Sequence, residues 1–476
     1  MQFNSWAYLI FLIFVLIIYY FLDRKNQNIF LLIASYFFYS AWDWRFSGLI
    51  LISTLVDYVC GKKIHASGDL RIRRRFLVLS VVVNLGLLAV FKYFNFFLDN
   101  FYLLINSLGF NPDRVSLRIL LPVGISFYTF QTLSYSIDIY RKKIEPSENF
   151  LDFALFVAFF PQLVAGPIER AKNMLPQISA RRSFKLDDFE KGIWLIYWGL
   201  FKKIFIADNL AFLVNENFAN SAQISFPVAY LSLVAFAFQI YCDFSAYTDI
   251  ARGSARLFGF RLMNNFNFPY LAENPQDFWR RWHISLSTWL RDYLYISLGG
   301  NRKGRFLTYR NLFITMVLGG LWHGAAWNFV LWGAYHGFIL MIYRFISELR
   351  EIRLGRWISV FIMYQFTLLG WLLFRCTRTE LVNGLWVDRS FYQIMEFLGS
   401  IFRGFYLDPQ FWTLFKDILF FIAPLIFLET LQYLSKDKYI IIRVPSYISI
   451  PINAMIIFFL VRYGVQGGDA FIYFQF

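Results

Sequence analysis

Trp279-Arg280-Arg281-Trp282-His283 and Gly320-Leu321-Trp322-His323-Gly324 are the two motifs that decide the fold, and both lie within residues 279–327. They hold two of the four histidines of the chain. His283 follows a pair of arginines, whereas His323 lies inside an apolar run, residues 311–345. An ionisable side chain at membrane depth is costly and usually marks a functional position. The two histidines are therefore the first candidates for a functional site.

The composition around these motifs is that of a polytopic membrane protein. Of the 476 residues, 58% are hydrophobic and only 16% are charged, and the mean hydropathy is +0.48. Long apolar runs at residues 6–22, 76–91 and 226–241 match the roughly 20 helical residues that cross a bilayer. The alternating pattern of a transmembrane barrel does not occur. The sequence therefore predicts an all-α polytopic membrane protein.

The formal charge of +15 does not indicate nucleic acid as a partner. The cations fall in loops between the apolar runs, where membrane orientation explains them. Three separated cysteines without a Cys-x-x-Cys spacing predict neither a metal cluster nor a disulfide framework. The first apolar run lacks a basic leader and a small-residue cleavage site, so we expect an uncleaved first helix. No soluble domain or linker interrupts the chain, which predicts one membrane domain over residues 1–476.

Alternation of cationic and non-cationic loops gives about twelve crossings with both chain ends outside. Residues 150–166 are too short for a crossing and favour a re-entrant or interfacial segment. Residues 279–298 suit amphipathic helices in the inner interface. Residues 311–345 predict a tight hairpin that turns near Gly324, or a broken helix. The other expected spans are residues 6–22, 28–42, 46–60, 76–97, a fifth that ends at residue 141, 192–213, a seventh from 226, 357–374, 411–432 and 445–463.

Two polar stretches are unusual for membrane depth. Lys202 and Lys203 lie in the middle of an expected span, where they either snorkel from a tilted helix or line a polar cavity. Residues 239–249 contain several polar side chains and two aspartates, Asp243 and Asp249. They are either a helix end that reaches the headgroups or the wall of a polar cavity.

His323 is the first catalytic candidate, because a neutral imidazole takes a proton from a hydroxyl group near neutral pH. At 1.5 Å per residue it lies about 18 Å from the inner boundary of the membrane. The alternative is a structural histidine at the hairpin turn. Arg280 and Arg281 suit a phosphate-bearing ligand beside His283, or else they anchor lipid headgroups together with Trp279.

The remaining two histidines are weaker candidates for a functional site. His336 is expected to be a packing residue, and His65 to be solvated in a basic loop. No nucleophile elbow, phosphate-binding loop or His-Glu-x-x-His zinc motif is present in the sequence. Hydrolase, nucleotidase and zinc-protease activities therefore have no support.

Five separate motifs in order resemble those of the membrane-bound O-acyltransferase family, over essentially the whole chain. The branch it resembles acts in bacterial O-acetylation of polysaccharides such as alginate and peptidoglycan. The motifs are Leu121-Pro122-Val123-Gly124-Ile125-Ser126-Phe127, Gly166-Pro167-Ile168-Glu169-Arg170, Tyr241-Cys242-Asp243-Phe244-Ser245 and the two quoted above.

This resemblance implies a helical bundle around a central pore, with re-entrant and interfacial helices, in the inner membrane of a bacterium. It also implies that His323 is catalytic, that His283 supports it, and that acetyl-CoA from the cytoplasm is the acyl donor, with no metal. Trp279, Arg280 and Arg281 would then bind the donor at the cationic inner mouth. Besides membrane lipid, the expected partner is an extracytoplasmic SGNH-type acetyltransferase or another polysaccharide-modifying protein.

The last six residues, Phe471-Ile472-Tyr473-Phe474-Gln475-Phe476, resemble the Phe-x-Tyr-x-x-Phe end of the partner peptide in teichoic acid D-alanylation. That resemblance implies that Tyr473 carries the acyl group. Ten residues from Tyr463 extend at most about 33 Å, and His323 is expected about 12 Å from the outer boundary, so the tail has the required reach. The alternative is an aromatic tail that docks in the interface belt.

The function predicted from the sequence is transfer of acetyl groups across the membrane to an exported or cell-wall polysaccharide. Two other classes compete with it. A transporter or flippase for a polysaccharide precursor would show internal repeats, and a structural scaffold for a polysaccharide synthase would leave the cost of His323 unexplained.

Overall fold

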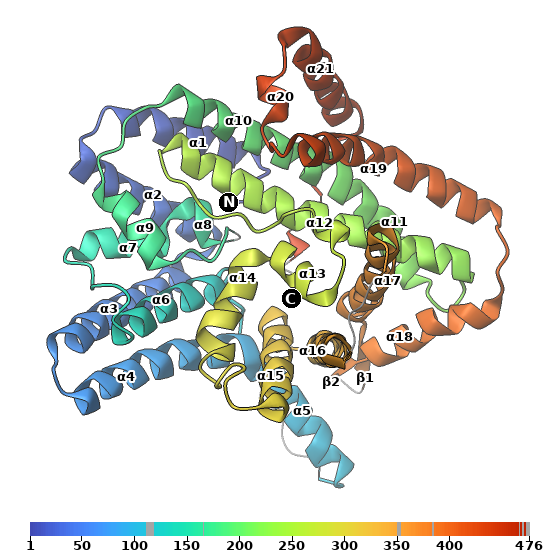
Figure 1. Cartoon of the computed structure of the whole chain (residues 1–476), viewed down its shortest axis with the longest axis horizontal. Coiled ribbons are helices and arrows are strands. Elements are labelled where there is room, and N and C mark those ends of the chain that lie inside the picture. Colours follow the sequence, from blue (N-terminus) through green and yellow to red (C-terminus); the bar gives the residue numbers. More distant parts are fainter. Residues whose placement is uncertain are drawn as a thin grey trace. The chain divides into compact units, whose positions relative to one another are not determined.

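The computed structural model describes residues 1–110, 119–164, 166–349, 354–382, 385–465, 467–468 and 471–472. These residues form helices almost throughout, as Figure 1 shows. Two short antiparallel strands, β1 (Thr379–Val382) and β2 (Leu385–Asp388), pair with Thr379 opposite Asp388. The predicted all-α class is confirmed, and the β hairpin is an addition that the sequence pattern did not indicate.

The chain folds into two units. Unit 1 comprises residues 1–196 and 250–263, and unit 2 comprises residues 197–249 and 264–476. The helices that lie wholly in unit 1 are α1 (Trp6–Tyr20), α2 (Arg24–Asp43), α3 (Ser47–Ala66), α4 (Leu70–Leu88), α5 (Phe94–Ser107), α6 (Ile125–Tyr140), α7 (Phe150–Ala158), α8 (Phe160–Leu163) and α9 (Ala171–Ser179). Helices α10 (Leu186–Leu200) and α12 (Phe226–Leu257) contribute residues to both units.

Unit 2 contains the motifs with the two histidines. Four of its described helical segments are not α-helical: η3 (Phe201–Ala207) and η5 (Leu290–Tyr295) are π-helical, and η4 (Pro269–Leu271) and η6 (Ser400–Arg403) are short 3₁₀ helices. Its α-helices are α11 (Asp208–Ala219), α13 (Pro275–Arg281), α14 (Ile284–Trp289), α15 (Arg305–His323), α16 (Trp327–Leu349), α17 (Arg356–Arg375), α18 (Ser390–Gly399), α19 (Pro409–Ser435), α20 (Ile440–Arg443) and α21 (Ser446–Tyr463).

Six helices in the described part of the chain are long and apolar enough to cross a membrane. Among them, α17, α19 and α21 coincide with the predicted spans 357–374, 411–432 and 445–463. Helices α2 and α3 are also 20 residues long, but they carry more polar residues and do not belong to the six. The protein is thus a multi-pass membrane protein, and the number of about twelve crossings stays a prediction.

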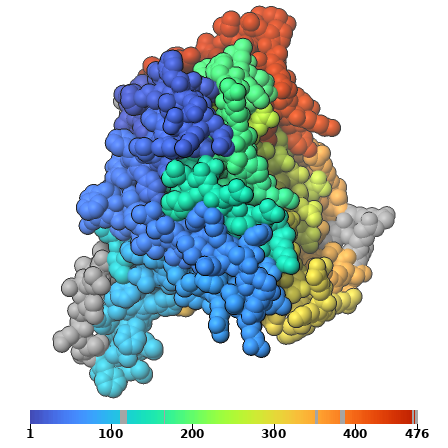
Figure 2. Space-filling model, turned by 90° about the vertical axis from the view of Figure 1, so that its left-hand side faces the viewer, coloured from blue at the N-terminus to red at the C-terminus, as the bar shows by residue number. Residues whose placement is uncertain are grey.

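The N-terminal helices expose apolar side chains, as helices in contact with lipid do. Much of the face in Figure 2 consists of these helices, coloured blue. Exposed residues on α1 and α4 include Ile10, Phe14, Ile17, Val78 and Val82. Such a large apolar surface is tolerated in a bilayer and would be unfavourable in water.

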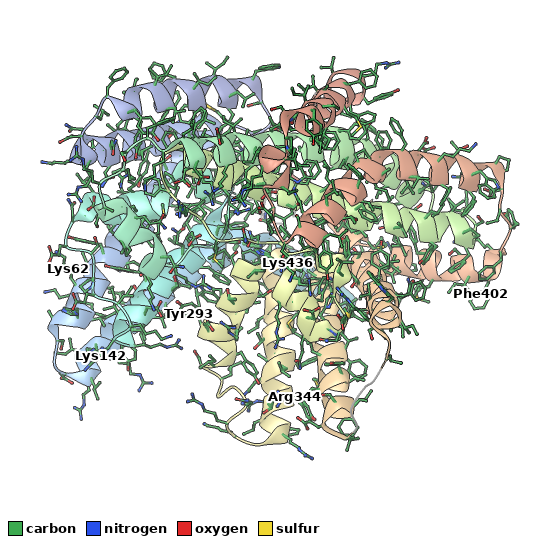
Figure 3. The ribbon with its side chains drawn as sticks, turned by 45° about the horizontal axis from the view of Figure 1, so that its top comes forward. Lys62, Lys142, Tyr293, Arg344, Phe402 and Lys436 are labelled. Atoms are coloured by element: carbon green, nitrogen blue, oxygen red, sulfur yellow. The ribbon has the colours of Figure 1, made fainter. Side chains whose placement is uncertain are left out.

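Two cationic segments gather at one end of unit 1. The end of α3 packs on the end of α6, because a Cβ built on Gly61 would lie 2.8 Å from the Tyr135 ring. Arg73 donates a hydrogen bond to the carbonyl oxygen of Tyr140 at 2.6 Å. Lys62 and Lys142 both point outward from this region in Figure 3, and both are exposed. This arrangement supports the prediction that both segments face the same side of the membrane.

The segment at residues 150–166 forms two short helices, α7 and α8, which meet at Phe159. Helix α7 has nine residues, and at 1.5 Å per residue it is about 14 Å long, too short to cross a bilayer. Phe153, Phe156 and Phe160 are fully buried within unit 1. The segment is thus packed inside its unit, and its re-entrant or interfacial character stays a prediction.

Candidate active site

The hairpin of α15 and α16 places His323 at the last position of α15, and three residues separate it from the start of α16. The two helices pack backbone against backbone, because a Cβ on Gly320 would lie 2.2 Å from the Phe329 carbonyl oxygen. A Cβ on Gly333 would lie 2.4 Å from the Met316 carbonyl oxygen. Small residues permit this close approach. The predicted hairpin with its turn at Gly324 is confirmed, and its tight packing fixes the position of His323.

Aromatic side chains surround the imidazole of His323, which is 4% exposed. The Trp332 ring meets it edge to face, with the ring centroids 5.0 Å apart and the planes at 89°. The centroids of Trp322 and Phe374 lie 5.1 Å and 5.7 Å away. Trp322 comes from α15, Trp332 from α16 and Phe374 from α17. Three helices therefore pack against the imidazole.

His283 lies between α13 and α14 in a left-handed backbone conformation, with φ 42° and ψ 54°. The backbone there is held by Asn265: its carbonyl oxygen accepts the Ile284 N–H at 2.9 Å, and its side-chain oxygen accepts the Ser285 N–H at 3.1 Å. Left-handed conformations of residues other than glycine cost energy and cluster at functional sites. Because the side chain is completely buried, desolvation lowers the pKa of His283 to about 3.

The two histidines meet inside unit 2. Their ring centroids are 6.2 Å apart, with the planes at 57°. The residue pattern alone did not place the two histidines together, whereas the family resemblance implied that His283 supports His323. The segment with α13, α14 and η5 is also more buried than interfacial helices would be, since Trp282, His283 and Trp289 are all buried. The two imidazoles therefore lie in one buried aromatic cluster.

The three residues predicted to bind the donor have different surroundings. Arg280 is exposed on α13, whereas Nε of Arg281 lies 2.8 Å from the Asp277 carboxylate. Trp279 packs edge to face on His336, with centroids 5.1 Å apart. His336 is 1% exposed and packs among aromatic rings, as predicted. Of the three, Arg280 presents the most accessible cation for a phosphate group.

Sequence reasoning did not predict the partners of Lys202 and Lys203. Both lysines are buried on η3, and they do not snorkel. Nζ of Lys202 lies 2.7 Å from the Asp249 carboxylate and 2.8 Å from the Ser245 hydroxyl oxygen. Nζ of Lys203 lies 2.7 Å from Asp208 and 2.9 Å from Asp243. Asp208 and the aspartates of residues 239–249 therefore neutralise both lysines. The signal in the sequence was that opposite charges occur in apolar stretches, which does not tell which residues pair.

Tyr473, the predicted acyl carrier, lies outside the described residues. The two residues before it are described and buried in unit 2. The Phe471 ring stacks on Tyr247 at a centroid distance of 4.3 Å and lies 5.6 Å from Phe244. Phe244 in turn meets His283 edge to face at 4.7 Å. The tail thus enters the same aromatic cluster as His283.

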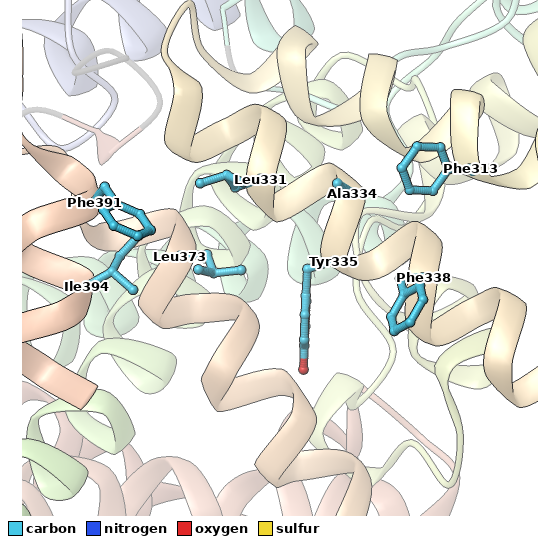
Figure 4. Close-up of a pocket in the computed structure, with 8 residues that line it drawn as sticks. All are labelled: Phe313, Leu331, Ala334, Tyr335, Phe338, Leu373, Phe391 and Ile394. Carbon is cyan, nitrogen blue, oxygen red and sulfur yellow. The ribbon is translucent and has the colours of Figure 1, made fainter. Parts of the chain in front are cut away.

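One apolar pocket of about 440 Å³ lies on the helices of the hairpin and their neighbours, as the close-up in Figure 4 shows. The Tyr335 hydroxyl donates a hydrogen bond to the Phe366 carbonyl oxygen at 2.7 Å. None of the predicted site residues lines the pocket, so we assign it no role in the chemistry. The pocket is lined by Phe313, Leu331, Ala334, Tyr335, Phe338, Leu373, Phe391 and Ile394.

Comparison with known proteins identifies the family. A model of the membrane-bound O-acyltransferase family matches residues 37–382, which include both histidines. The chain is 46% identical over 385 residues to the probable alginate O-acetylase AlgI of Azotobacter vinelandii, covering 80% of this chain and 76% of the relative.

More distant relatives share the same class of reaction. The chain is 38% identical over 382 residues to the peptidoglycan O-acetyltransferase of Helicobacter pylori, covering 74% of this chain and 72% of the relative. It is 27% identical over 270 residues to the teichoic acid D-alanyltransferase of Bacillus subtilis, covering 53% and 68%. Five motifs in order, the helical fold, the family match and these relatives lead to one conclusion: the chain is an acyltransferase that belongs to the membrane-bound O-acyltransferase family.

Proposed function

We propose that this enzyme takes an acetyl group from cytoplasmic acetyl-CoA and passes it across the membrane for O-acetylation of an exported or cell-wall polysaccharide. The observation that carries the proposal is the buried pair of His283 and His323 within the family-matched region. The relatives are named for acetylation of alginate and of peptidoglycan, which supports acetyl as the group and a polysaccharide as the acceptor. The proposed location is the inner membrane of a bacterium.

In this proposal His323 is the general base and His283 is the polar residue that supports it. The acyl donor enters through the central pore that the family resemblance implies, and its phosphates are bound by Arg280 and Arg281 beside Trp279. The exposure of Arg280 supports a role in binding a charged ligand. The family model extends over residues of both units, which supports the view that residues 1–476 act as one membrane domain.

The proposed transfer uses Tyr473 as a covalent carrier. His323 takes the phenolic proton as the Tyr473 oxygen attacks the thioester carbonyl carbon. A C–O bond forms, the C–S bond breaks, and the proton passes from His323 to the departing thiolate of CoA. The acetyl-tyrosine ester then delivers its acetyl group to the serine of an extracytoplasmic SGNH-type transferase, which restores the phenol. The buried position of Phe471 beside the His283 cluster supports this route.

Incubation of the purified protein with radiolabelled acetyl-CoA tests the proposal. We expect the wild-type protein to release CoA and to incorporate label, and His323→Ala to lose at least about a hundredfold in rate, as expected for removal of a general base. His336→Gln is the matched control, because it changes another buried histidine of the same hairpin. Equal rates for wild type and His323→Ala would overturn the assignment. A transporter would move its substrate without consuming acetyl-CoA.

A further inference from the structure

We propose that Lys203 and Asp243 are positioning residues that anchor the C-terminal segment of the chain beside the two histidines. The anchor itself follows from contacts within unit 2, whereas its consequence for acyl transfer rests on the proposed function. The segment concerned comprises Gly464, Val465, Gly467, Gly468, Phe471 and Ile472.

The anchor begins with a buried cation between two buried carboxylates. Lys203, Asp208 and Asp243 are 1%, 3% and 4% exposed, and Nζ of Lys203 lies 2.7 Å from Asp208 Oδ1 and 2.9 Å from Asp243 Oδ1. Each carboxylate has two oxygens that accept several hydrogen bonds, so among the described contacts Asp243 accepts a further donor besides Lys203. Lys203 lies on the π-helical segment η3, a type of irregularity frequent at functional sites.

The tail supplies such a donor. The backbone N–H of Ile472 donates a hydrogen bond to Asp243 Oδ2 at 2.7 Å. A bond from an amide to a carboxylate is charge-assisted and is roughly twice as strong as a neutral one. Lys203 holds the carboxylate through its other oxygen, so the orientation of Asp243 and the position of Ile472 are set together.

A second contact fixes the neighbouring residue. Phe471 is 0% exposed and stacks on Tyr247 with centroids 4.3 Å apart and planes at 26°. Tyr247 follows Asp243 by one turn of α12 and therefore lies on the same face of that helix. The backbone of Ile472 and the ring of Phe471 are thus held by one face of α12, which fixes the direction of the chain as well as its position.

The earlier part of the tail follows η3 closely. The Val465 N–H donates to the Ile204 carbonyl oxygen at 3.2 Å. A Cβ built on Gly468 would lie 2.5 Å from Asp208 Oδ2, so the tail backbone touches the second carboxylate of the cluster as well. Attachment at three successive points, of which the last is buried, distinguishes this segment from an aromatic tail that only docks in the membrane interface.

Phe244, the residue after Asp243, connects the anchored tail to the histidines. The centroid of its ring lies 5.6 Å from that of Phe471 and 4.7 Å from that of His283. Phe471 and Ile472 are therefore the described residues through which the anchor acts, and the chain that follows them starts beside this cluster. Lys203 and Asp243 would then act on transfer through the tail, without touching the acyl group.

Chemical labelling of a cysteine in the tail tests the anchor without any acyl transfer. Ile472→Cys is introduced after Cys60, Cys242 and Cys376 have been replaced by alanine, and the rate of reaction with a maleimide is measured in detergent. The Ile472 side chain is 5% exposed, so labelling of the otherwise unchanged tail is expected to be slow. We expect Asp243→Ala to accelerate it at least about tenfold.

Glu429→Ala is the control, since Glu429 on α19 accepts a hydrogen bond from the Tyr241 hydroxyl on α12. It removes a carboxylate that is hydrogen-bonded to α12 at Tyr241, two residues from Asp243, and this bond does not involve the tail. Unchanged labelling in Asp243→Ala, or an equal acceleration in Glu429→Ala, would overturn the anchor. Hydrogen exchange at the Ile472 amide tests the same anchor independently and is measured with all native cysteines present. The exchange rate should increase in Asp243→Ala.

Acetyl transfer kinetics separate the anchor from the proposed function. We expect Asp243→Ala to lower kcat at least about tenfold and to leave KM for acetyl-CoA unchanged, because the tail and not the donor is displaced. Faster labelling with an unchanged kcat would overturn the positioning role. Loss of the proposed function, in contrast, would appear as a wild-type protein that does not consume acetyl-CoA, whatever the labelling rates.

Discussion

His283 and His323 lie with their ring centroids 6.2 Å apart, and each is held in place by a different feature. His283 has a left-handed backbone, a strained conformation that persists only where the surrounding packing over-determines it. His323 ends a helix whose glycine-lined contact with α16 admits no side chain. Both features fix the positions of the two imidazoles, which is what a shared role in chemistry requires.

Replacement of His283 separates its backbone role from its imidazole. Asn tolerates the left-handed region, whereas a β-branched residue does not. We expect His283→Asn and His283→Val both to lose at least about tenfold in acetyl transfer. Only His283→Val should also lose about 1–3 kcal/mol of stability from backbone strain. Thermal unfolding in detergent measures the difference, and full activity of His283→Asn would contradict a role for the imidazole.

Gly320→Ala should disrupt the hairpin that carries His323. The added methyl group would lie 2.2 Å from the Phe329 carbonyl oxygen, so α15 and α16 must separate, and overpacking of this kind costs about 1–3 kcal/mol. The unfolding temperature and the transfer rate should therefore fall together. Gly86→Ala is the control, since a Cβ there meets nothing within 4 Å and alanine favours a helix interior by up to about 1 kcal/mol. Equal stability of the two variants would show that the hairpin contact is loose.

The sequence predicted those features that one segment determines alone. The apolar lengths predicted α17, α19 and α21 to within three residues at each end, and the small residues near Gly324 predicted the hairpin turn. The pairing of Lys203 with Asp243 could not be predicted in this way, because it depends on which faces of η3 and α12 meet. The 6.2 Å separation of the His283 and His323 rings could not be predicted from the residue pattern either, and only the family resemblance implied that His283 supports His323. Periodicity describes one element, whereas a site arises between elements.

Glu169 should make the stability of the protein depend on pH. It is 1% exposed and accepts a hydrogen bond from the Met263 N–H. Burial raises the pKa of Glu169 to about 7, although that hydrogen bond and the charges of Arg170 and Arg252 oppose the shift. The ordinary pKa of a glutamate is 4.5, so between pH 4.5 and pH 7 Glu169 has lost its proton in the unfolded chain but keeps it in the folded chain. Stability therefore falls as the pH rises through this window, by about 3 kcal/mol in total.

Glu169→Gln tests this dependence, since the amide oxygen still accepts the Met263 N–H but does not titrate. We expect Glu169→Gln to raise the unfolding temperature relative to wild type at pH 8 and to raise it much less at pH 4.5. Glu148→Gln, which changes an exposed carboxylate, should show no such difference. A constant offset between wild type and Glu169→Gln at both pH values would contradict the assignment.

Arg280→Gln should weaken binding of the donor and leave the chemical step intact. The Arg280 side chain is exposed on α13, where a guanidinium group pairs well with phosphate. We expect KM for acetyl-CoA to rise about tenfold, less at high salt, with kcat nearly unchanged. Arg74→Gln removes an exposed arginine of unit 1 and serves as the control. Equal KM values for wild type and Arg280→Gln would contradict binding of the donor and would favour the alternative that Arg280 contacts lipid headgroups.

Tyr473→Phe decides between an acyl carrier and an aromatic tail that only docks. The substitution removes the phenolic oxygen and keeps the ring, so the contacts of Phe471 and Ile472 with Tyr247 and Asp243 should persist. If the phenol carries the acetyl group, the variant retains no hydroxylamine-labile label and transfer to the partner ceases. Tyr463→Phe, at the end of α21, is the matched control and should label normally.

The same experiment also orders the two steps of the reaction. Because the first step needs only the enzyme and acetyl-CoA, wild-type protein without a partner should accumulate acetyl label on its C-terminal peptide, detected by mass spectrometry. His323→Ala should not accumulate it, since the phenol then lacks its base. Label that appears equally in Tyr473→Phe would place the acyl group on another residue, and the anchored tail would then have a purely structural role.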